Sequence, residues 1–477
     1  MAELENSIVS GASRQLEIRA VATPAVAGQP RILQDNTPLT RDLGERRMVI
    51  WAETGDGATQ YPKKHFASWG SDTTGDGSET NPYRLPGKAA AEAANSMTDP
   101  LQGGWRAIGL DAQEVDLSLP GTFGKFDALK RWGTIEGHES LPRSAIKIVS
   151  MTQGGLKTAL TRFHNLTFRV PFDALATSQD GADTVLWFDG VDIGATTLAG
   201  RSAFPQGAVK SITPVPYRVL LTDSKLELVK QAANKVVLID RCIIRRVEID
   251  CCANTKAIFD TVFENVGEPL VPLPGDPHED VVQWQQTAEM DNLIYSGLHV
   301  TSPYNYQTFF FRYNVAAVNF RNVAIVNCLT NPPTGFDAKS QWLVNAHHLL
   351  LMHVSHARRI FLFGDDGDGF ARQMKDVLVL GNAMFRINRN NTIANDINFQ
   401  FHYNLYGSGT NWGGTQNGNQ GPEAPDWDPD TLRPIPGTNL IAKVVPWTVP
   451  IDLDGLARPF VSGSGFKATR GVYEPQT

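Results

Sequence analysis

One short phrase in the middle of the chain combines the residue types that acid–base chemistry needs. It reads His-Glu-Asp-Val-Val-Gln from His278 to Gln283, with the aspartate at Asp280. Histidine and aspartate can act as base and acid in the cleavage of a glycan, and the aspartate can instead hold a cation that neutralises a uronate carboxylate. The phrase also suits a polar edge whose side chains hydrogen-bond neighbouring turns of chain. Both interpretations remain open.

Polar residues farther along the chain extend this candidate site. A lyase needs a cation to stabilise an enolate, and Arg312, Arg358 and Arg359 are available. A hydrolase instead needs two carboxylates about 5 to 10 Å apart, which residues on strands stacked ~4.8 Å apart can satisfy. The predicted catalytic residues are His278, Asp280 and Arg312. The predicted carbohydrate-binding residues are Gln283, Asn345, Asp366, Tyr406 and Trp412.

The two aromatic residues of that binding set come from the stretch between Tyr403 and Gly421, which is rich in Gly, Asn, Gln and aromatic residues. Aromatic side chains flanked by amides commonly line carbohydrate sites. A long irregular loop over the end of the fold is the alternative interpretation.

A metal site is not expected. Asp366 and Asp368, in Asp-Gly-Asp-Gly, resemble a fragment of a calcium-binding loop. A complete loop needs further ligands and a bidentate glutamate at a fixed position, and these are missing here. We therefore expect a solvated turn, with no metal and no other cofactor.

A repeated sequence phrase indicates the strands that must position these residues. A polar residue, usually Asn, is followed by alternating apolar residues and then often by a small or polar residue. Nine copies begin at Asn165, Thr184, Tyr217, Asn234, Lys256, Asn292, Asn322, His348 and Asp376. Period-2 alternation indicates strands with one face inside, so a helical repeat is excluded. The polar residue suits a bend, and a stacked Asn can hydrogen-bond the turns above and below it.

The spacing of the copies predicts a solenoid. Successive copies begin 17 to 36 residues apart, and one coil of three short strands needs ~20 residues or more. Further apolar runs lie between them and are interpreted as strands of a second sheet: Val281–Trp284, Phe309–Phe311, Trp342–Val344, Ile360–Phe363 and Phe399–Phe401. We therefore predict an all-β fold, a right-handed parallel β-helix with an N-terminal extended arm and a short capping helix.

Composition limits the function classes. The 477 residues hold 42% hydrophobic residues, enough for a sizeable core, and 43 basic against 50 acidic residues give a formal charge of −7. A nucleic-acid binder would need clustered Lys and Arg, and no run approaches the ~20 apolar residues of a membrane span. The first thirty residues hold no apolar run, so we expect no signal peptide. The four cysteines show no metal or disulfide spacing and are expected to be buried thiols.

Two stretches resemble motifs of bacterial and phage right-handed β-helix proteins, the pectate-lyase-like superfamily. The first combines Trp69-Gly70-Ser71-Asp72, Gly75-Asp76-Gly77-Ser78 and Asn81-Pro82-Tyr83-Arg84 with an Ala-rich run to Ala94, and is similar to the turn and capping helix that open such domains. The second, Asp452-Leu453-Asp454-Gly455 with Arg458-Pro459 and Gly471-Val472-Tyr473-Glu474, is similar to their closing motif, with Val472 in place of the usual Ala.

The resemblance implies a function class but no single activity. The superfamily includes lyases, hydrolases, tailspikes and inert fibres, so function must be argued from the site. We expect a phage virion protein: a homotrimeric tailspike, receptor-binding spike or capsid-decorating fibre that is released by lysis. The alternative is a polysaccharide lyase or glycoside hydrolase that acts on a surface glycan in the groove, and whether the chain is an enzyme stays open. The expected partners are further copies of the chain, virion head or tail proteins and bacterial surface polysaccharide.

The expected domain organisation follows from where the resemblance begins and the repeats end. Residues 1–64 are predicted to be an arm that binds the particle or a partner. Residues 65–405 are predicted to form the β-helix with its cap near residues 86–97. Residues 406–477 are predicted to form a loop-rich wrap that includes the closing motif.

Overall fold

The structure, a computed structural model, describes the polypeptide in segments, and for some strands, including all those before residue 62, it describes the backbone alone. The described residues are 8–10, 14–16, 19–22, 32–36, 46–49, 62–97, 104–117, 132–150, 160–169, 185–194, 219–229, 233–234, 236, 238–247, 251–253, 255, 257–268, 280–286, 290–302, 307–313, 320–331, 341–344, 346–363, 375–389, 397–402, 404–409, 415–417, 460–461 and 465–466.

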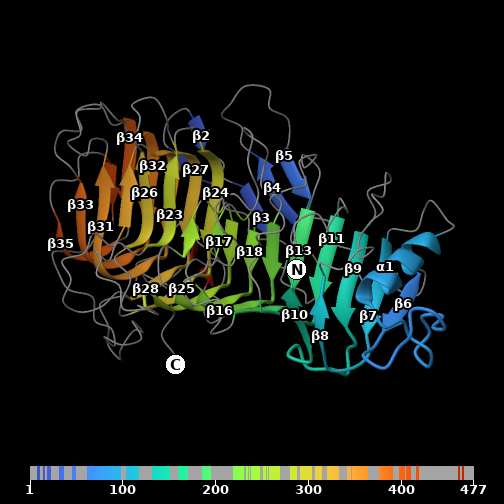
Figure 1. The fold of residues 1–477 in the computed structure, drawn as a ribbon. Coiled ribbons are helices and arrows are strands. Elements are labelled where there is room, and N and C mark those ends of the chain that lie inside the picture. The colour runs from blue at the N-terminus through green and yellow to red at the C-terminus, as the bar shows by residue number, and fades with distance from the viewer. Residues whose placement is uncertain are drawn as a thin grey trace.

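The chain is a parallel β-helix, in which strands of successive coils stack into long walls (Figure 1). The first wall is a fourteen-stranded, all-parallel sheet. Its strands are β6 (Lys63–Phe66), β7 (Gly104–Gly109), β9 (Trp132–Gly137), β11 (Leu160–His164), β13 (Val185–Asp189), β15 (Val219–Thr222), β18 (Leu238–Asp240), β21 (Ala257–Phe259), β24 (Met290–Ser296), β27 (Phe320–Val326), β30 (Ala346–Met352), β32 (Lys375–Leu380), β34 (Ile397–His402) and β36 (Thr415–Asn417).

The remaining parallel strands form two further walls that merge at the far end. The second wall holds β8 (Gln113–Asp116), β10 (Ile146–Ser150), β12 (Thr167–Phe168), β14 (Asp192–Ile193), β16 (Lys225–Val229), β19 (Ile243–Val247), β22 (Val262–Val266), β25 (His299–Thr301) and β28 (Leu329–Asn331). The third wall holds β17 (Ala233–Asn234), β20 (Cys252–Ala253), β23 (Asp280–Gln286), β26 (Gln307–Tyr313) and β29 (Gln341–Val344). The long strand β31 (Ser355–Phe363) pairs with both β28 and β29, and β33 (Ala383–Arg389) and β35 (Leu405–Gly409) continue from it.

The repeated phrase marks the first wall. Eight of the nine copies coincide with first-wall strands, from β13 to β32, and the copy at Asn165 leads into β12. Four of the five intervening runs coincide with β23, β26, β29 and β31. The prediction for Phe399–Phe401 was wrong, because that run lies in β34 of the first wall. Its alternation is the same in either wall, so only the pairing partner distinguishes them.

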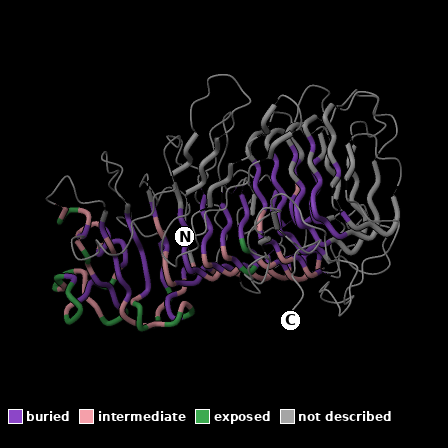
Figure 2. Tube along the Cα trace, turned by 180° about the vertical axis from the view of Figure 1, so that it is seen from behind, coloured by how far each residue is buried: buried purple, intermediate pink, exposed green. Residues whose placement is uncertain are grey.

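Figure 2 shows that buried residues run along the stacked strands of the solenoid. Along the first wall the register stacks Ile135, Phe163, Phe188 and Leu221 in one inward row, and all four are fully buried. The rings of Phe163 and Phe188 stack with centroids 5.4 Å apart. Alternate side chains of each strand point inward, and each inward residue lies on its equivalent in the coil before. The coils therefore share one continuous core.

A left-handed residue ends most first-wall strands and turns the chain toward the second wall. Positive φ recurs at Asn165, Gly190, Asp223, Arg241, Asp260, Gly297, Asn327, His353 and Gly381. The next residue points inward, and where it is Ser224, Cys242, Thr261 or Cys328 it donates a hydrogen bond to the carbonyl two residues earlier. The thiols of Cys242 and Cys328 therefore make the same turn hydrogen bond as the hydroxyl groups of Ser224 and Thr261.

The prediction of buried thiols is confirmed, since all four cysteines are buried and free. Burial raises the pKa of the Cys328 thiol to about 12. Asparagine ladders also occur as expected. Asn165 donates from Nδ2 to the carbonyls of Gly137 and His138 in the coil before.

One end of the solenoid is closed by a loop and the helix α1 (Pro86–Asn95), which confirms the predicted cap. In the loop, Asp72 Oδ1 accepts hydrogen bonds from the backbone N–H groups of Arg84 and Leu85, 3.0 Å each, and so fixes the start of the helix. Gly70 is required there, because a Cβ would lie 2.2 Å from the carbonyl oxygen of Tyr83. The helix buries Ala89, Ala90 and Ala93 against the end of the core.

Shorter antiparallel pairings lie outside the walls. Before the solenoid, β1 (Ile8–Ser10) pairs with β2 (Arg14–Leu16), and β3 (Arg19–Ala22), β4 (Ile32–Asn36) and β5 (Arg46–Val49) form a three-stranded sheet. After it, β37 (Phe460–Val461) pairs with β38 (Gly465–Phe466). Within the described residues, no helix is long and apolar enough to cross a membrane. The predicted domain boundaries stay predictions, although parallel pairing runs from Lys63 to Asn417.

Candidate functional site

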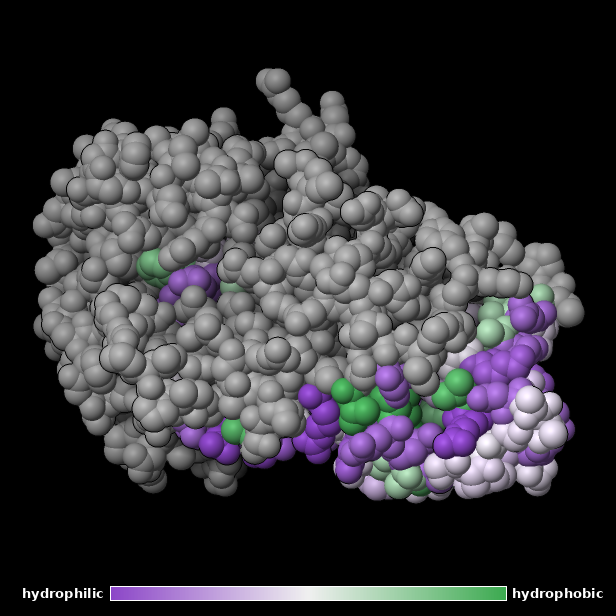
Figure 3. Space-filling view, in the orientation of Figure 1, coloured by the Kyte–Doolittle hydropathy of each residue, from purple (hydrophilic) through white to green (hydrophobic). Residues whose placement is uncertain are grey.

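The first five coils carry two largely polar rows on the outer face of the first wall. The register aligns Lys63, Arg106, Thr134 and Arg162 in a basic row. Two residues further along each strand, it aligns His65, Ile108, Glu136, His164 and Asp189 in a second row. Figure 3 shows hydrophilic residues gathered on the surface at this capped end.

Each arginine of the basic row reaches a carboxylate of the next coil. Arg106 Nε lies 2.5 Å from Glu136 Oε1, and Arg162 Nη2 lies 2.5 Å from Asp189 Oδ2. Both carboxylate side chains are only 3% exposed, so the pairs are largely shielded from solvent. The two rows therefore form an ion-pair ladder in which each of the two arginines is matched to an acid one coil ahead.

Asp189 is the most strongly held member of this ladder. It also accepts a 2.7 Å hydrogen bond from Thr222 Oγ1, and His164 Nδ1 lies 3.2 Å from its Oδ2. Burial opposes ionisation of Asp189, but the hydrogen bond from His164 and the charge of Arg162 outweigh it and hold the pKa well below its ordinary value. The Arg162 guanidinium also lies 4.4 Å from the centre of the Trp187 ring.

The ladder lacks its acid at the first rung. By the geometry of Arg106 and Arg162, the partner of Lys63 should stand at position 108, and an isoleucine occupies it. Lys63 is exposed, and no described residue forms an ion pair with it. Among the described residues, the Lys63 ammonium group is therefore the member of this basic row without an ion-pair partner.

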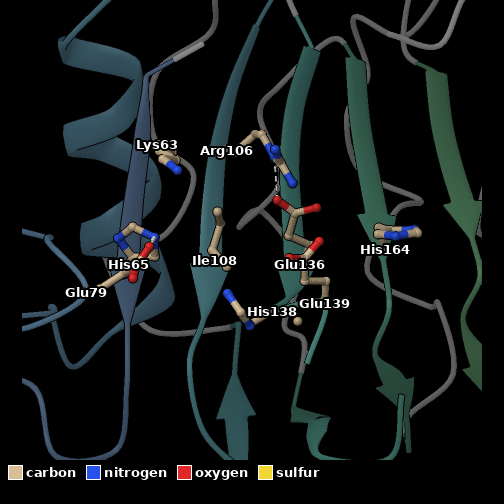
Figure 4. A pocket seen from close by; sticks show the side chains of 10 residues that line it. Lys63, His65, Glu79, Arg106, Ile108, Glu136, His138, Glu139 and His164 are labelled. Carbon is tan, nitrogen blue, oxygen red and sulfur yellow. Dashed lines mark hydrogen bonds and ion pairs between the residues drawn. The ribbon is translucent and has the colours of Figure 1, made fainter. Parts of the chain in front are cut away.

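A pocket of about 240 Å³ opens beside this lysine. Side chains from β6, β7, β9 and β11 line it, together with Glu79 of the cap loop and the turn that holds His138 and Glu139 (Figure 4). The lining combines two cations, three carboxylates and three histidines around the apolar side chain of Ile108. We call this hollow the Lys63 pocket.

The histidines of the pocket are held in defined orientations. His65 Nδ1 donates to the carbonyl of Gly77 at 3.0 Å, and its Nε2 lies 3.6 Å from Glu79. Burial lowers the pKa of His65, although both of these contacts oppose that shift, so the ring is neutral at pH 7. His164 donates from Nδ1 to the Asp189 carbonyl at 3.0 Å, which leaves Nε2 as the acceptor. His138 contacts Ser140 Oγ through Nδ1 at 2.7 Å.

The pocket can bind an anion and exchange protons with it. Lys63 and Arg106 supply positive charge, while imidazoles and the exposed Glu79 and Glu139 supply hydrogen-bond partners for hydroxyl groups. In the described part of the chain, no group of three His, Cys, Asp or Glu side chains is arranged to hold a metal ion. The indole of Trp69, in the cap loop after β6, is 58% exposed and offers an aromatic face to solvent.

The structure brings together two of the residues predicted from the sequence. Asp280, at the start of β23, is 3% exposed, and Gln283 donates from Nε2 to Asp280 Oδ2 at 3.2 Å. The Asp280 carbonyl accepts the N–H of Cys251 from the coil before, at 2.8 Å. The first contact lies within one strand and the second joins backbone groups, so both interpretations of the phrase stay predictions. His278 lies outside the described residues.

The other predicted residues are not placed beside Asp280. Arg312 in β26 pairs with Gln285, whereas Asp280 pairs with Gln307, so Arg312 stands five residues farther along the wall, about 16 Å away at 3.3 Å per residue. Tyr406 lies in β35 opposite Met384, and only its backbone is described. Asn345, Asp366, Asp368 and Trp412 lie outside the described residues, so their predicted roles, and the absence of a calcium ion, stay predictions.

Sequence reasoning missed the Lys63 pocket. Its residues come from four separate strands and two turns, and the intervals between these strands are irregular, so no spacing in the sequence joins them. The available signal was the alternation in β6, where Lys63 and His65 share one face and Phe66 points inside. In comparisons of the sequence, no family model matches the chain and no curated protein is significantly similar to it.

Proposed function

We propose that this protein is a β-helix spike or fibre that binds an acidic glycan in the Lys63 pocket. One observation carries the proposal, namely the missing rung of the ion-pair ladder. Ile108 stands where the acid partner of Lys63 is expected, so no described carboxylate forms an ion pair with this ammonium group at the pocket wall. A sugar carboxylate supplies the absent charge.

A sugar suits the rest of the lining better than a simple inorganic anion. The pocket presents imidazoles and carboxylates that can exchange hydrogen bonds with hydroxyl groups. The row from His65 to His164 crosses three strand spacings, about 14 Å, which is long enough for more than one sugar. A nucleic acid would demand several clustered cations, and the formal charge of the chain is −7.

Binding assays with matched variants test this proposal. The full chain is titrated by calorimetry with acidic oligosaccharides and with neutral ones of equal length. Lys63→Gln is expected to weaken binding of the acidic set about tenfold, because one charge-assisted contact is lost. Lys64→Gln is the control, since Lys64 Nζ donates to the Asp76 carbonyl at 2.8 Å and does not line the pocket.

A second variant restores the missing rung. Ile108→Glu places an acid one coil ahead of Lys63, in the position that Glu136 holds relative to Arg106. This variant is expected to neutralise the charge of Lys63 and to weaken the binding of acidic ligands as strongly as Lys63→Gln does. Equal binding of acidic and neutral glycans by the unchanged protein would refute the proposal, as would unchanged binding in both variants.

Glycan cleavage is a second candidate function, favoured by the orientation of His164. Its Nδ1 contacts Asp189, so Nε2 carries the lone pair at the pocket wall, which is the arrangement of a general base. With Lys63 and Arg106 near a uronate carboxylate, this geometry suits β-elimination by a lyase. His164→Ala should then abolish the ultraviolet absorbance of unsaturated uronate product and retain glycan binding. If the protein binds acidic polysaccharides but releases no product from them, only the glycan-binding function remains.

The assembly that we propose is a homotrimer in a phage virion, attached to head or tail proteins through residues 1–64. The sequence motifs at the two ends of the solenoid support this, because they are similar to those of β-helix tailspikes and fibres. Analytical ultracentrifugation of the full chain should give three times the monomer mass of 52.3 kDa. A monomer at micromolar concentration would contradict the trimer and leave the pocket proposal standing.

A further inference from the structure

Beyond β13, one of the two outer rows of the first wall changes from charged to apolar. The row that begins with Lys63 and Arg106 continues through Leu220, Leu238, Ala257, Ile294 and Ala324. The row that begins with His65 is mixed, since it continues through Thr222, Asp240, Phe259 and Ser296 before Val326, Met352 and Leu380. These positions alternate with the inward rows, and none of them belongs to the core cluster.

These outward apolar side chains are nevertheless buried. Leu238 is 1% exposed, Phe259 2% and Met352 2%. An outward apolar side chain on an uncovered sheet keeps one side toward water, as the 44% exposed Ile243 of the second wall does. A further part of this same chain therefore covers Leu238, Phe259 and Met352.

The arm sheet β3–β4–β5 has the properties of such a layer. Within the described residues its three strands pair with one another and with no other strand, and a sheet of four- and five-residue strands needs an apolar surface to be stable. Figure 1 shows β3, β4 and β5 alongside the middle of the solenoid, at the level of β13 to β24, and not beyond α1. Sheets also pack face to face, which suits the flat, apolar outer wall.

We propose that β3–β4–β5 packs on the outer face of the first wall of its own chain, as a second layer over β15 to β24. This assigns the N-terminal arm an intramolecular docking site, which goes beyond glycan binding in the Lys63 pocket. The wall requires a cover for solubility, because its apolar row extends over several coils. The arm, which precedes β6 of the same wall, supplies it.

Photo-crosslinking in the full chain tests this contact. Phe259→p-benzoylphenylalanine places a reactive ring on the covered wall with little change of shape. After irradiation and digestion, mass spectrometry should find most crosslinked peptides within residues 1–61. Trp69→p-benzoylphenylalanine, at a 58% exposed position, is the control and should give no crosslink to the arm. Mixing isotopically heavy and light chains should give crosslinks only within one chain.

Thiol labelling provides an independent measurement, since all four native cysteines are buried. Leu238→Cys should react with a maleimide at least tenfold more slowly than Ile243→Cys, which lies on the exposed face of the second wall. Adding Gln34→Pro, which removes a backbone donor from the central arm strand β4, should accelerate labelling of Leu238→Cys at least tenfold.

Each alternative result would overturn the proposal. Crosslinks from Phe259 to residues 418–477, to an insertion between coils or to another copy would assign the cover to a different segment. Equal labelling of Leu238→Cys and Ile243→Cys would show that the wall is open. If Leu238→Cys still reacts slowly with the maleimide when Gln34→Pro is added, the arm sheet is not the layer that covers the wall.

Discussion

Asp189 is the most strongly held residue of the ion-pair ladder and is poorly suited to proton transfer in catalysis. Asp189 is 3% exposed and is held by Arg162, Thr222 and His164 together. A carboxylate with a strongly lowered pKa stays ionised and does not exchange protons near neutral pH. Asp189 therefore orients His164 and neutralises Arg162, and proton transfer in the pocket falls to the histidines.

Replacing this carboxylate should destabilise the protein. Asp189→Asn leaves the Arg162 guanidinium without its charge partner, and breaking a shielded pair from one side costs about 3 kcal/mol. The free energy of unfolding, measured by urea denaturation at pH 7, reports the loss. Asp192→Asn is the matched control, because its pair with Arg143 is 3.6 Å long and both side chains are about 40% exposed. That control should change stability by less than about 0.5 kcal/mol.

The pH dependence of the same substitution has a defined sign. The folded-state pKa of Asp189 lies below the unfolded value, so its stabilisation is present above about pH 4 to 5 and is lost as the pH falls toward the folded pKa. The stability difference between Asp189→Asn and the unchanged protein should therefore shrink with acidification below about pH 4. A difference that stays constant from pH 7 to pH 3 would contradict the assigned ionisation.

At the scale of the element, buried asparagines link the turns that end β30, β32 and β34 across coils. Asn382 Oδ1 accepts the N–H of Val354 at 2.8 Å, and its Nδ2 donates to the Leu351 carbonyl at 3.0 Å. Asn404 Oδ1 in turn accepts the N–H of Asn382 at 2.9 Å. Both asparagines are fully buried, so their amides satisfy backbone groups that water cannot reach.

Removing one asparagine should therefore leave backbone groups of the preceding coil without a hydrogen-bond partner. Asn382→Val keeps the shape found at Val354 in the preceding coil and leaves the Val354 N–H and the Leu351 carbonyl without this partner, a cost of about 2 kcal/mol. Thermal unfolding measures the loss. The double variant with Asn404→Val should cost less than the sum of the two single changes, because the amides are in one network. Additive losses would show that the asparagines act separately.

The first-wall strands were predictable from the sequence, and their partners were not. Alternation followed by a polar residue located β13 to β32, because the inward row and the turn impose both features on every coil. Phe399–Phe401 shows the limit, since its alternation is correct and its wall is not. The proximity of Asp280 and Gln283 was also found, because both belong to one strand.

The Lys63 pocket shows the same limit for a site. It unites Lys63, Arg106, Glu136 and His164 from consecutive coils, and this register depends on how many residues each intervening loop absorbs. The missing rung at Ile108 is visible only after the strands are aligned. An isoleucine in a strand is ordinary by itself and becomes informative when its neighbours in the stack are known.

At the scale of the whole molecule, stability should vary along the solenoid axis. Each coil contacts only its neighbours, so the folded state behaves as a one-dimensional stack that can open from an end. The capped end has a defined lid, because α1 buries Ala89, Ala90 and Ala93 against β6 and β7. The Lys63 pocket lies directly beside this lid, so ligand binding and the integrity of the cap are coupled.

Opening the cap should therefore unfold the near coils first. Ala93→Asp places a carboxylate at a fully buried position against the core and is expected to cost about 2 kcal/mol locally. Hydrogen exchange followed by mass spectrometry should show lost protection in β6, β7 and β9 and unchanged protection in β24 to β32, together with weaker glycan binding. Ala91→Asp is the control, since it carries the same helix-propensity cost at a partly exposed position of α1. Uniform loss of protection in all coils would show instead that the solenoid unfolds as a single cooperative unit, with the cap and the far end inseparable.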